Sequence, residues 1–327
     1  LLGHTAAEPA IRIADETLAL DELTAVWEAP LEPVFPTRAA GEGSAPVIRF
    51  TERSAAHPAV LCNRPRAVIP VFPGTNCEYD TARAVERAGG EAQIVVVRNL
   101  TSDMLAESIR ETKEALRGAQ MLIFPGGFSG GDEPDGSGKF IAAYFRNPEL
   151  EEAVHALLER DGLMLGICNG FQALIKLGLV PYGRIRPMDA SCPTLTYNNI
   201  GRHEARYVTT RVASVKSPWL SLCEPDALYS VPISHGEGRF VADEQTLEAL
   251  AANGQIAFQY ADPSGAPSMD IACNPNGSAW AIEGITSPDG RILGKMAHTE
   301  RAGAQIGLNI AGNRYQPIFE GGVRYFR

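Results

Sequence analysis

The sequence predicts an α/β protein with one mixed, mostly parallel sheet that carries helices on both faces. Apolar runs of four to six residues alternate with helical stretches between residues 67 and 177, a pattern typical of βαβ units. After Val180 the strand signals follow one another, which predicts an antiparallel extension. With 327 residues, 45% of them hydrophobic, the chain is long enough to bury such a core.

The elements follow in order along the chain. The first strand signal covers residues 67–72, although Pro70 within it is unfavourable for a central strand. A helix over 79–88 ends at a pair of glycines. Further strands are expected at residues 92–97, 121–124, 163–167, 205–215, 228–233, 256–260, 279–286 and 291–296. Further helices are expected from Thr101 or Ser102 to residue 116, over 140–160 with a break at Asn147-Pro148, and over 170–177.

Residues 1–65 differ from the rest of the chain. They are rich in Pro, Gly and Ala, as extended linkers are, with one short helix expected over 19–27. The sequence begins with Leu1 rather than Met, which suggests a fragment. We therefore expect a tail or linker over residues 1–65 and a folded domain over residues 66–327.

Charge and composition argue against several classes of function. The net charge of -10 and the lack of clustered Lys and Arg argue against a nucleic-acid surface. No apolar stretch of membrane-spanning length and no signal peptide is visible, so no contact with a membrane is expected. A chain of this size does not need disulfides to fold, so we expect a reducing, cytoplasmic setting. The six cysteines are scattered, with no CxxC pair, so no metal site is expected.

The candidate nucleophile is Cys168, in the run Gly166-Ile-Cys-Asn-Gly170 between a buried strand and a helix. This is the thiol counterpart of a nucleophile elbow, in which flanking glycines permit a sharp turn. The helix N-terminus is expected to lower the thiol pKa, and the Asn169 N–H to face a developing oxyanion. The alternative is a small buried hydrophobe. Cys77 lacks the symmetric glycines and is interpreted as structural or adjacent to a pocket.

The candidate base is His298, because Glu300 two residues later can orient its imidazole. His235 is the rival base. It lies in a glycine-flanked run with Glu237 and Arg239, which we interpret as lining a substrate pocket rather than as an exposed turn. A Gly-rich loop, PGGFSGGD over residues 125–132, follows the third strand and can supply a second oxyanion donor.

Five motifs in the same order give the chain its resemblance to a known family: FPGTNCEYD, PGGFSGGD, GICNGFQ, SHGEGRF and NPNGS. They resemble class I, triad-type glutamine amidotransferases. More narrowly, they are similar to the glutaminase domain of phosphoribosylformylglycinamidine synthase in its long, single-chain form. The resemblance covers residues 66–326 and implies a flavodoxin-like fold.

The resemblance implies a role for each matching residue. Cys168 would attack the glutamine carboxamide, His298 would pass a proton to the departing ammonia, and Glu300 would orient His298. The amides of Gly127 and Asn169 would form the oxyanion hole. Four residues would line the glutamine pocket: Phe128, Gln172, His235 and Glu237. One departure is Thr299, where many relatives have Pro between the His and the Glu.

The same resemblance implies partners and cofactors. Ammonia would pass to a synthetase region of the same enzyme, of which residues 1–65 would be the end, for amidation of formylglycinamide ribonucleotide in purine biosynthesis. ATP and Mg²⁺ would be needed only in that region, so no cofactor is expected here. The alternatives are a stand-alone glutaminase subunit recruited by a separate synthetase, a docking or regulatory module with little turnover alone, and a cysteine hydrolase on the same fold.

Overall fold

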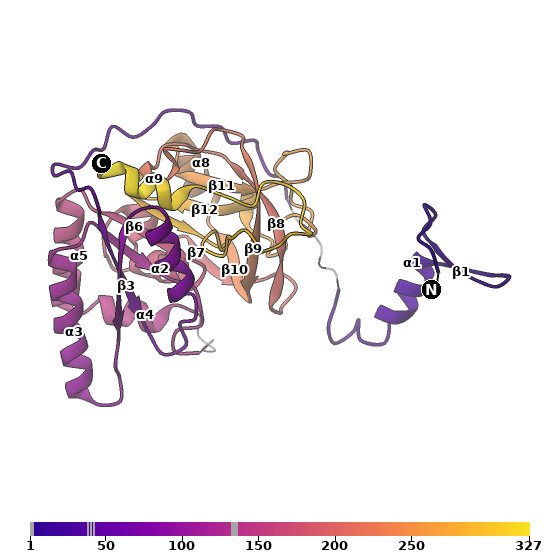
Figure 1. Cartoon of the computed structure of the whole chain (residues 1–327), viewed down its shortest axis with the longest axis horizontal. Coiled ribbons are helices and arrows are strands. Elements are labelled where there is room, and N and C mark those ends of the chain that lie inside the picture. The colour runs from indigo at the N-terminus through magenta and orange to yellow at the C-terminus, as the bar shows by residue number, and fades with distance from the viewer. Residues whose placement is uncertain (1–2, 38, 40, 42, 132–136) are drawn as a thin grey trace. The chain divides into compact units, whose positions relative to one another are not determined.

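The computed structural model describes residues 3–37, 39, 41, 43–131 and 137–327, in two compact units that divide between Ala40 and Gly41. The larger unit is built on a nine-stranded sheet of order β4-β3-β5-β6-β13-β12-β11-β8-β9 (Figure 1). Among its described strands, only β12 and β8 run against the others. The expected mixed, mostly parallel sheet is therefore confirmed.

The parallel half of the sheet consists of five strands. They are β3 (Arg66–Val71), β4 (Glu91–Val96), β5 (Met121–Phe124), β6 (Leu163–Ile167) and β13 (Ile292–Lys295). β5, β6 and β13 are buried at every position, as expected for strands covered on both faces. β13 is the last strand in the sequence, yet it lies beside β6 in the centre of the sheet.

Helices cover both faces of this half. Their bounds are α2 (Glu78–Arg87), α3 (Ser102–Arg117), α4 (Lys139–Phe145), α5 (Pro148–Glu159), α6 (Asn169–Leu177), α7 (Leu179–Tyr182) and α9 (Ile318–Tyr325). α2 packs against α9, whereas α3 packs against α5 and α4 against α6, so two separate layers form. The predicted caps and breaks hold: Thr101 accepts from the Met104 N–H, and Asn147 caps α5 just before Pro148.

The second half of the sheet is antiparallel. It contains β8 (Glu204–Val212), β9 (Leu228–His235), β11 (Ile256–Tyr260) and β12 (Ile282–Thr286), with α8 (Glu244–Ala252) and two short 3₁₀ turns, η1 (Pro218–Leu220) and η2 (Ala279–Ala281). A separate two-stranded sheet pairs β7 (Thr194–Tyr197) with β10 (Glu237–Val241). The sequence did not predict β7 or β10.

Pro70 lies in β3, which is an internal strand of the sheet. The pairing of β3 with β5 ends at Val68, two residues before Pro70. Alternate residues of a parallel strand bond to opposite neighbours, and Arg66, which shares the parity of Pro70, bonds toward β5 through Gln120. The missing N–H of Pro70 therefore faces the side on which pairing has already ended, which explains how the sheet accepts a proline here.

Residues of the segment before β3 are integrated in the larger unit. Phe50 pairs with Ser214, and the Arg53 guanidinium donates to the carbonyls of Leu220 and Cys223, both at 3.0 Å. These contacts are more specific than those expected of a loose tail. The origin of residues 1–65 in a synthetase region stays a prediction.

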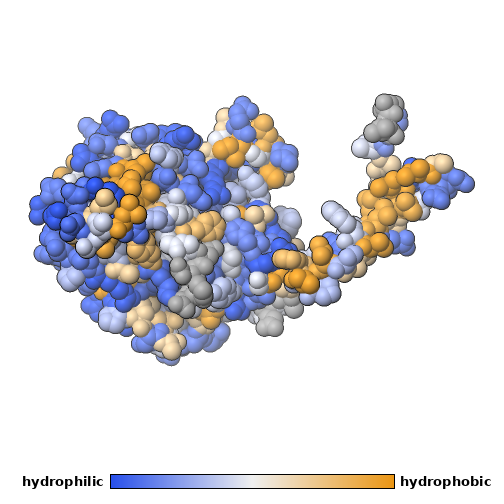
Figure 2. Space-filling view, turned by 90° about the horizontal axis from the view of Figure 1, so that it is seen from below, coloured by the Kyte–Doolittle hydropathy of each residue, from blue (hydrophilic) through white to orange (hydrophobic). Residues whose placement is uncertain are grey.

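The smaller unit contains a hairpin, β1 (Ala10–Ile13) with β2 (Glu16–Ala19), and the helix α1 (Leu20–Glu28). The helix agrees with the expected 19–27, whereas the hairpin was not predicted. None of the α1 residues is buried, and Trp27 is 85% exposed. Figure 2 shows apolar residues gathered on the surface of this unit, in which no described residue is buried.

Among the residues that the structure describes, no helix is both long and apolar enough to cross a membrane.

Candidate active site

The residue expected as nucleophile lies in a strained turn between β6 and α6. Cys168 has φ of +52°, a conformation that a non-glycine residue adopts only when its surroundings impose it. A Cβ at Gly170 would lie 2.0 Å from the Phe124 carbonyl oxygen, and one at Gly166 would lie 2.6 Å from the Gly170 carbonyl oxygen. Both glycines are therefore required by close backbone approach, as the sequence pattern predicts.

The Cys168 thiol is enclosed. The residue is 4% exposed, and its Sγ lies 3.6 Å from the Ser234 carbonyl oxygen. Burial, followed by the neighbouring Cys77 and Glu300, raises the pKa of the Cys168 thiol, while Arg301 and the Asn169 N–H act in the opposite direction. The prediction of a lowered pKa is therefore wrong for this closed structure, because desolvation of the thiolate outweighs the helix N-terminus.

His298 and Glu300 follow β13, the neighbour of β6, and their side chains meet. The His298 Nδ1 lies 2.6 Å from the Glu300 Oε1, and both residues are buried. Burial opposes the charge of Glu300, but His298 beside it holds the pKa of the carboxyl below its usual range. The His298 Nε2 is buried and has no hydrogen-bond partner among the described residues. The imidazole is thus oriented by a carboxylate on one side and free to exchange a proton on the other.

Cys77 belongs to the same cluster. Its Sγ lies 3.8 Å from the His298 Nδ1 and accepts a hydrogen bond of 3.1 Å from Arg301. Burial, followed by the Glu300 carboxylate, raises its pKa to about 11. Among the described residues, ligand atoms of Cys77, His298 and Glu300 lie within 4.8 Å of one another, as a metal site would require. The Arg301 guanidinium already supplies a cation to Cys77, which disfavours a second one.

The Gly-rich loop lies against the imidazole. A Cβ at Gly126 would lie 2.6 Å from the His298 Cε1. The Gly126 carbonyl accepts from the N–H groups of Asn76 and Cys77, at 3.4 Å and 3.3 Å. Because a trans peptide directs its C=O and N–H to opposite sides, the Gly127 N–H faces away from residues 76–77. The end of the predicted motif, Asp132, lies outside the described residues.

A chain of hydrogen bonds leads from the elbow to β10. The Asn169 side chain accepts from the Ser129 N–H at 3.2 Å and donates to Gln172 at 2.9 Å. Gln172 donates to the Glu237 carbonyl at 2.6 Å, and the Glu237 carboxylate accepts from Ser137. The predicted pocket residues Gln172 and Glu237 thus lie together, but here their polar groups bind to the protein itself.

His235, the rival base, is the last residue of β9 and follows Ser234, whose carbonyl oxygen faces the Cys168 Sγ. It is buried, and its Nδ1 is 3.1 Å from the Asn198 Oδ1. Burial, followed by the neighbouring His298 and His203, lowers its pKa to about 3. His235 therefore has an amide partner where His298 has a carboxylate, and burial disfavours its protonated form.

Phe128 lies at the rim of the site and is only partly buried. Its ring centroid is 6.0 Å from that of His203, whose Nε2 lies 3.1 Å from the Ser234 hydroxyl. His203 is exposed, and nothing in its sequence context distinguished it. The rim is therefore formed by one predicted residue and one that was missed.

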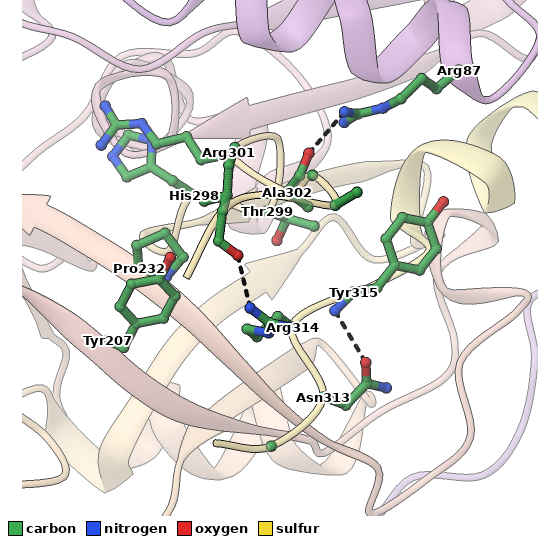
Figure 3. A pocket seen from close by; sticks show the side chains of 14 residues that line it. Arg87, Tyr207, Pro232, His298, Thr299, Arg301, Ala302, Asn313, Arg314 and Tyr315 are labelled. Carbon is green, nitrogen blue, oxygen red and sulfur yellow. Dashed lines mark hydrogen bonds between the residues drawn. The ribbon is translucent and has the colours of Figure 1, made fainter. Parts of the chain in front are cut away.

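A pocket of about 490 Å³ is lined in part by His298. Arg87, Arg301 and Arg314 line it together with Tyr207 and Tyr315, and none of its described lining residues is acidic. Figure 3 shows Arg87 bound to the Ala302 carbonyl, at 2.7 Å. Cys168 is not among the lining residues, so this pocket adjoins the base and not the nucleophile.

Comparison with known proteins identifies the family. Residues 64–326 match the family described as CobB/CobQ-like glutamine amidotransferase domain. The chain belongs to this family. The phosphoribosylformylglycinamidine synthase subunit PurQ of Symbiobacterium thermophilum is 37% identical over 238 residues, 73% of this chain and 88% of that protein. The PurQ subunit of Pyrococcus furiosus is 34% identical over 247 residues, 74% of this chain and 93% of that protein.

A solved structure gives the same result. A chain in the structure of PurLQS from Thermotoga maritima aligns with a TM-score of 0.58 and 26% identity, covering 81% of this chain and all of that one. The resemblance to the glutaminase of phosphoribosylformylglycinamidine synthase is therefore confirmed. The region that matches the family, residues 64–326, contains every residue of the candidate active site.

Proposed function

We propose that the chain hydrolyses glutamine to glutamate and ammonia, and that the ammonia serves the amidation of formylglycinamide ribonucleotide in purine biosynthesis. The observation that supports this most strongly is the placement of two adjacent strand ends. β6 ends in the strained Cys168 turn, and β13 beside it ends in the His298–Glu300 pair. The matches to glutamine amidotransferases and to PurQ subunits support the same activity.

The reaction begins with proton transfer from Cys168 to His298. The thiolate then attacks the carboxamide carbon of glutamine and forms a C–S bond, and the carbonyl oxygen becomes an oxyanion. As the oxyanion collapses, the C–N bond breaks, and imidazolium gives its proton to the departing ammonia. Water, deprotonated by His298, attacks the thioester carbon, the C–S bond breaks, and the imidazolium returns its proton to the Cys168 sulfur as glutamate is released. Glu300 stabilises the imidazolium throughout, and its buried contact of 2.6 Å with His298 suits this role.

The oxyanion is stabilised by the N–H groups of Gly127 and Asn169. Asn169 is the first residue of α6, and its N–H acts against the burial that raises the pKa of the adjacent Cys168 thiol. The Gly126 carbonyl is held by residues 76 and 77, so the Gly127 N–H is already turned away from them. Two fixed donors of this kind supply about 10²–10³-fold each in comparable enzymes.

Glutamine is bound by Phe128, Gln172, His235 and Glu237, which surround the elbow. Cys168 is 4% exposed, so the site must open before a substrate reaches the sulfur. This enclosure supports a second property: turnover is low in the free chain and rises when the synthetase docks. If turnover in the free chain were close to zero, the domain would act mainly as a docking module.

The partner is a synthetase that accepts ammonia and supplies the ATP and Mg²⁺ sites, so this chain needs no cofactor of its own. Residues 1–65 come from, or bind to, that synthetase. The unit over residues 1–40 supports this because its described apolar side chains, including Trp27 and Val34 at 85% and 70% exposure, are not buried in a core. The reaction takes place in the cytoplasm.

A glutamine-mimicking diazo-ketone tests the nucleophile. Incubation followed by peptide mapping is expected to find the label on Cys168, and Cys168→Ala is expected to lower glutamate release more than about 10³-fold. Cys192→Ala, outside the cluster, serves as the control and keeps wild-type activity. A label on Cys77, or turnover by Cys168→Ala in the presence of the synthetase, would contradict the assignment.

A further inference from the structure

A buried ion pair lies directly next to the His298–Glu300 turn. Lys295, the last residue of β13, and Glu283, on the neighbouring strand β12, are both 0% exposed. The Lys295 Nζ lies 3.4 Å from the Glu283 Oε1. Two charges removed from water in this way seldom stabilise a fold more than an apolar pair would. The presence of the pair in the centre of a sheet therefore calls for a role other than stability.

The pair binds both residues that flank His298 in the sequence. The Lys295 Nζ donates to the Ala297 carbonyl and to the Thr299 hydroxyl, at 2.8 Å each. The Glu283 Oε1 accepts from the Ala297 N–H at 2.7 Å. The three N–H donors of the lysine are thus matched by Ala297, Thr299 and Glu283. The turn that carries the imidazole is fixed on both sides by the ion pair.

Lys295 also contacts the nucleophile turn through its backbone. Its carbonyl accepts from the Cys168 N–H at 2.8 Å, one step beyond the last pairing of β13 with β6. One residue therefore binds the Cys168 turn with its main chain and the His298 turn with its side chain. Any displacement of Lys295 changes the position of the base relative to the sulfur.

Thr299 completes the network. Its hydroxyl accepts from Lys295 and donates to the Gln316 side chain at 2.6 Å. These two hydrogen bonds, from Lys295 and to Gln316, fix the side chain of the residue that lies between His298 and Glu300.

We propose that Lys295, held by Glu283 and Thr299, is a positioning residue that sets the His298 turn in register with the Cys168 elbow. The inference rests on the proposed glutaminase function. It does not make Lys295 a catalytic residue, because its ammonium acts through the backbone and hydroxyl groups beside His298. It predicts that loss of the network lowers kcat and leaves KM nearly unchanged, since no predicted substrate contact is removed.

The first test uses the full chain with Thr299→Val and its matched control Thr299→Ser. Valine has the shape of threonine but lacks the hydroxyl, so the Lys295 ammonium loses one hydrogen-bond acceptor. The Lys295–Glu283 pair stays intact. We expect Thr299→Val to lower kcat for glutamate release about tenfold, with KM within about twofold, because small misplacement of a catalytic group has large effects on rate. Thr299→Ser keeps the hydroxyl and is expected to stay within about twofold in both.

A second variant removes the pair as a unit. Lys295→Met with Glu283→Gln leaves no uncompensated buried charge, and kcat is expected to fall about a hundredfold. The second measurement is the rate at which iodoacetamide alkylates Cys168 between pH 6 and pH 10. If the network positions the base, the pH profile of both variants moves toward that of His298→Ala.

The outcomes separate the possibilities. Folded variants with a lowered melting temperature but wild-type kcat and an unchanged alkylation profile would overturn the inference, because the pair would then serve the fold alone. If the double variant does not fold, the comparison of Thr299→Val with Thr299→Ser decides. Absence of glutamate release by the wild-type chain in the presence of the synthetase would instead refute the proposed function, and it is measured in the same series.

Discussion

β6 and β13 lie side by side and end at the same edge of the sheet, but the turns that follow them are constrained in different ways. The turn after β6 is fixed by steric exclusion, since the backbone passes so close to itself that Gly166 and Gly170 accept no side chain. The turn after β13 is fixed by polar contacts from Glu283 and Lys295. The first needs small residues where the backbone of the turn meets itself and the end of β5, whereas the second needs two charged side chains from neighbouring strands.

The largest expected effect comes from breaking the steric turn. Gly170→Ala places a Cβ 2.0 Å from the Phe124 carbonyl oxygen, where only backbone can yield. We expect loss of several kcal/mol of folding free energy, or no folded protein, because overpacking against backbone cannot be relieved by a rotamer change. Urea unfolding measures it. Gly118→Ala, where the added Cβ would meet only the end of Arg66 at 3.4 Å, is the control. Equal stability of the two variants would show that the elbow is not sterically fixed.

The next effect concerns the polar turn. Glu300→Gln keeps the size of the side chain and removes the charge that stabilises imidazolium, so kcat is expected to fall about a hundredfold or more. Folding should be retained, since the amide still reaches the His298 Nδ1. Steady-state glutamate release measures the fall in kcat, and circular dichroism tests whether the variant is folded. A fall of less than about threefold would mean that Glu300 does not assist the base.

The third effect is a dependence on pH at the elbow. Burial raises the pKa of the Cys168 thiol, so the group stays protonated in the folded chain at neutral pH and the thiolate fraction grows as pH rises. Alkylation by iodoacetamide should increase about tenfold per pH unit between pH 7 and pH 9, without a plateau, because only the thiolate reacts. Free glutathione, whose thiol has an ordinary pKa, levels off earlier. A plateau below pH 7 at Cys168 would indicate a thiolate already formed.

The smallest effect separates the two histidines. His235→Gln removes an imidazole that lacks a carboxylate partner among the described residues and whose pKa burial lowers to about 3. We expect kcat to change less than about threefold and KM for glutamine to rise several-fold, as for a residue of the substrate pocket. Comparison with His298→Ala under the same conditions provides the reference. A loss of kcat as large as that of His298→Ala would reverse the assignment of the base.

Much of the fold was predictable because each element carries its own signal. The apolar runs placed β5 at residues 121–124 and β6 at residues 163–167, and the glycine spacing at the end of the second run identified the Cys168 turn. The pairing order was not predictable. That β13 lies between β6 and β12 depends on contacts between residues more than a hundred positions apart, which no local pattern records.

The predicted site was incomplete where residues act through tertiary contacts. Lys295 was hidden within an expected apolar strand, and Glu283 within another. Two opposite charges in two buried strands suggest a buried ion pair. That they form one can be inferred only once the strands are known to be neighbours. The position of Cys77 against His298 was missed for the same reason, because its segment binds to the Gly-rich loop over residues 125–127.

The central place of β13 has a consequence for how the site arises during folding. The nucleophile lies at residue 168, but its base arrives with the last strand of the sheet, and β13 must enter between two strands that precede it in the sequence. Contacts of such long range form late and slowly. A nascent chain that has already folded its first four parallel strands therefore holds the thiol without the histidine. Glutamine hydrolysis, with its release of ammonia, begins only when synthesis of the domain is nearly finished.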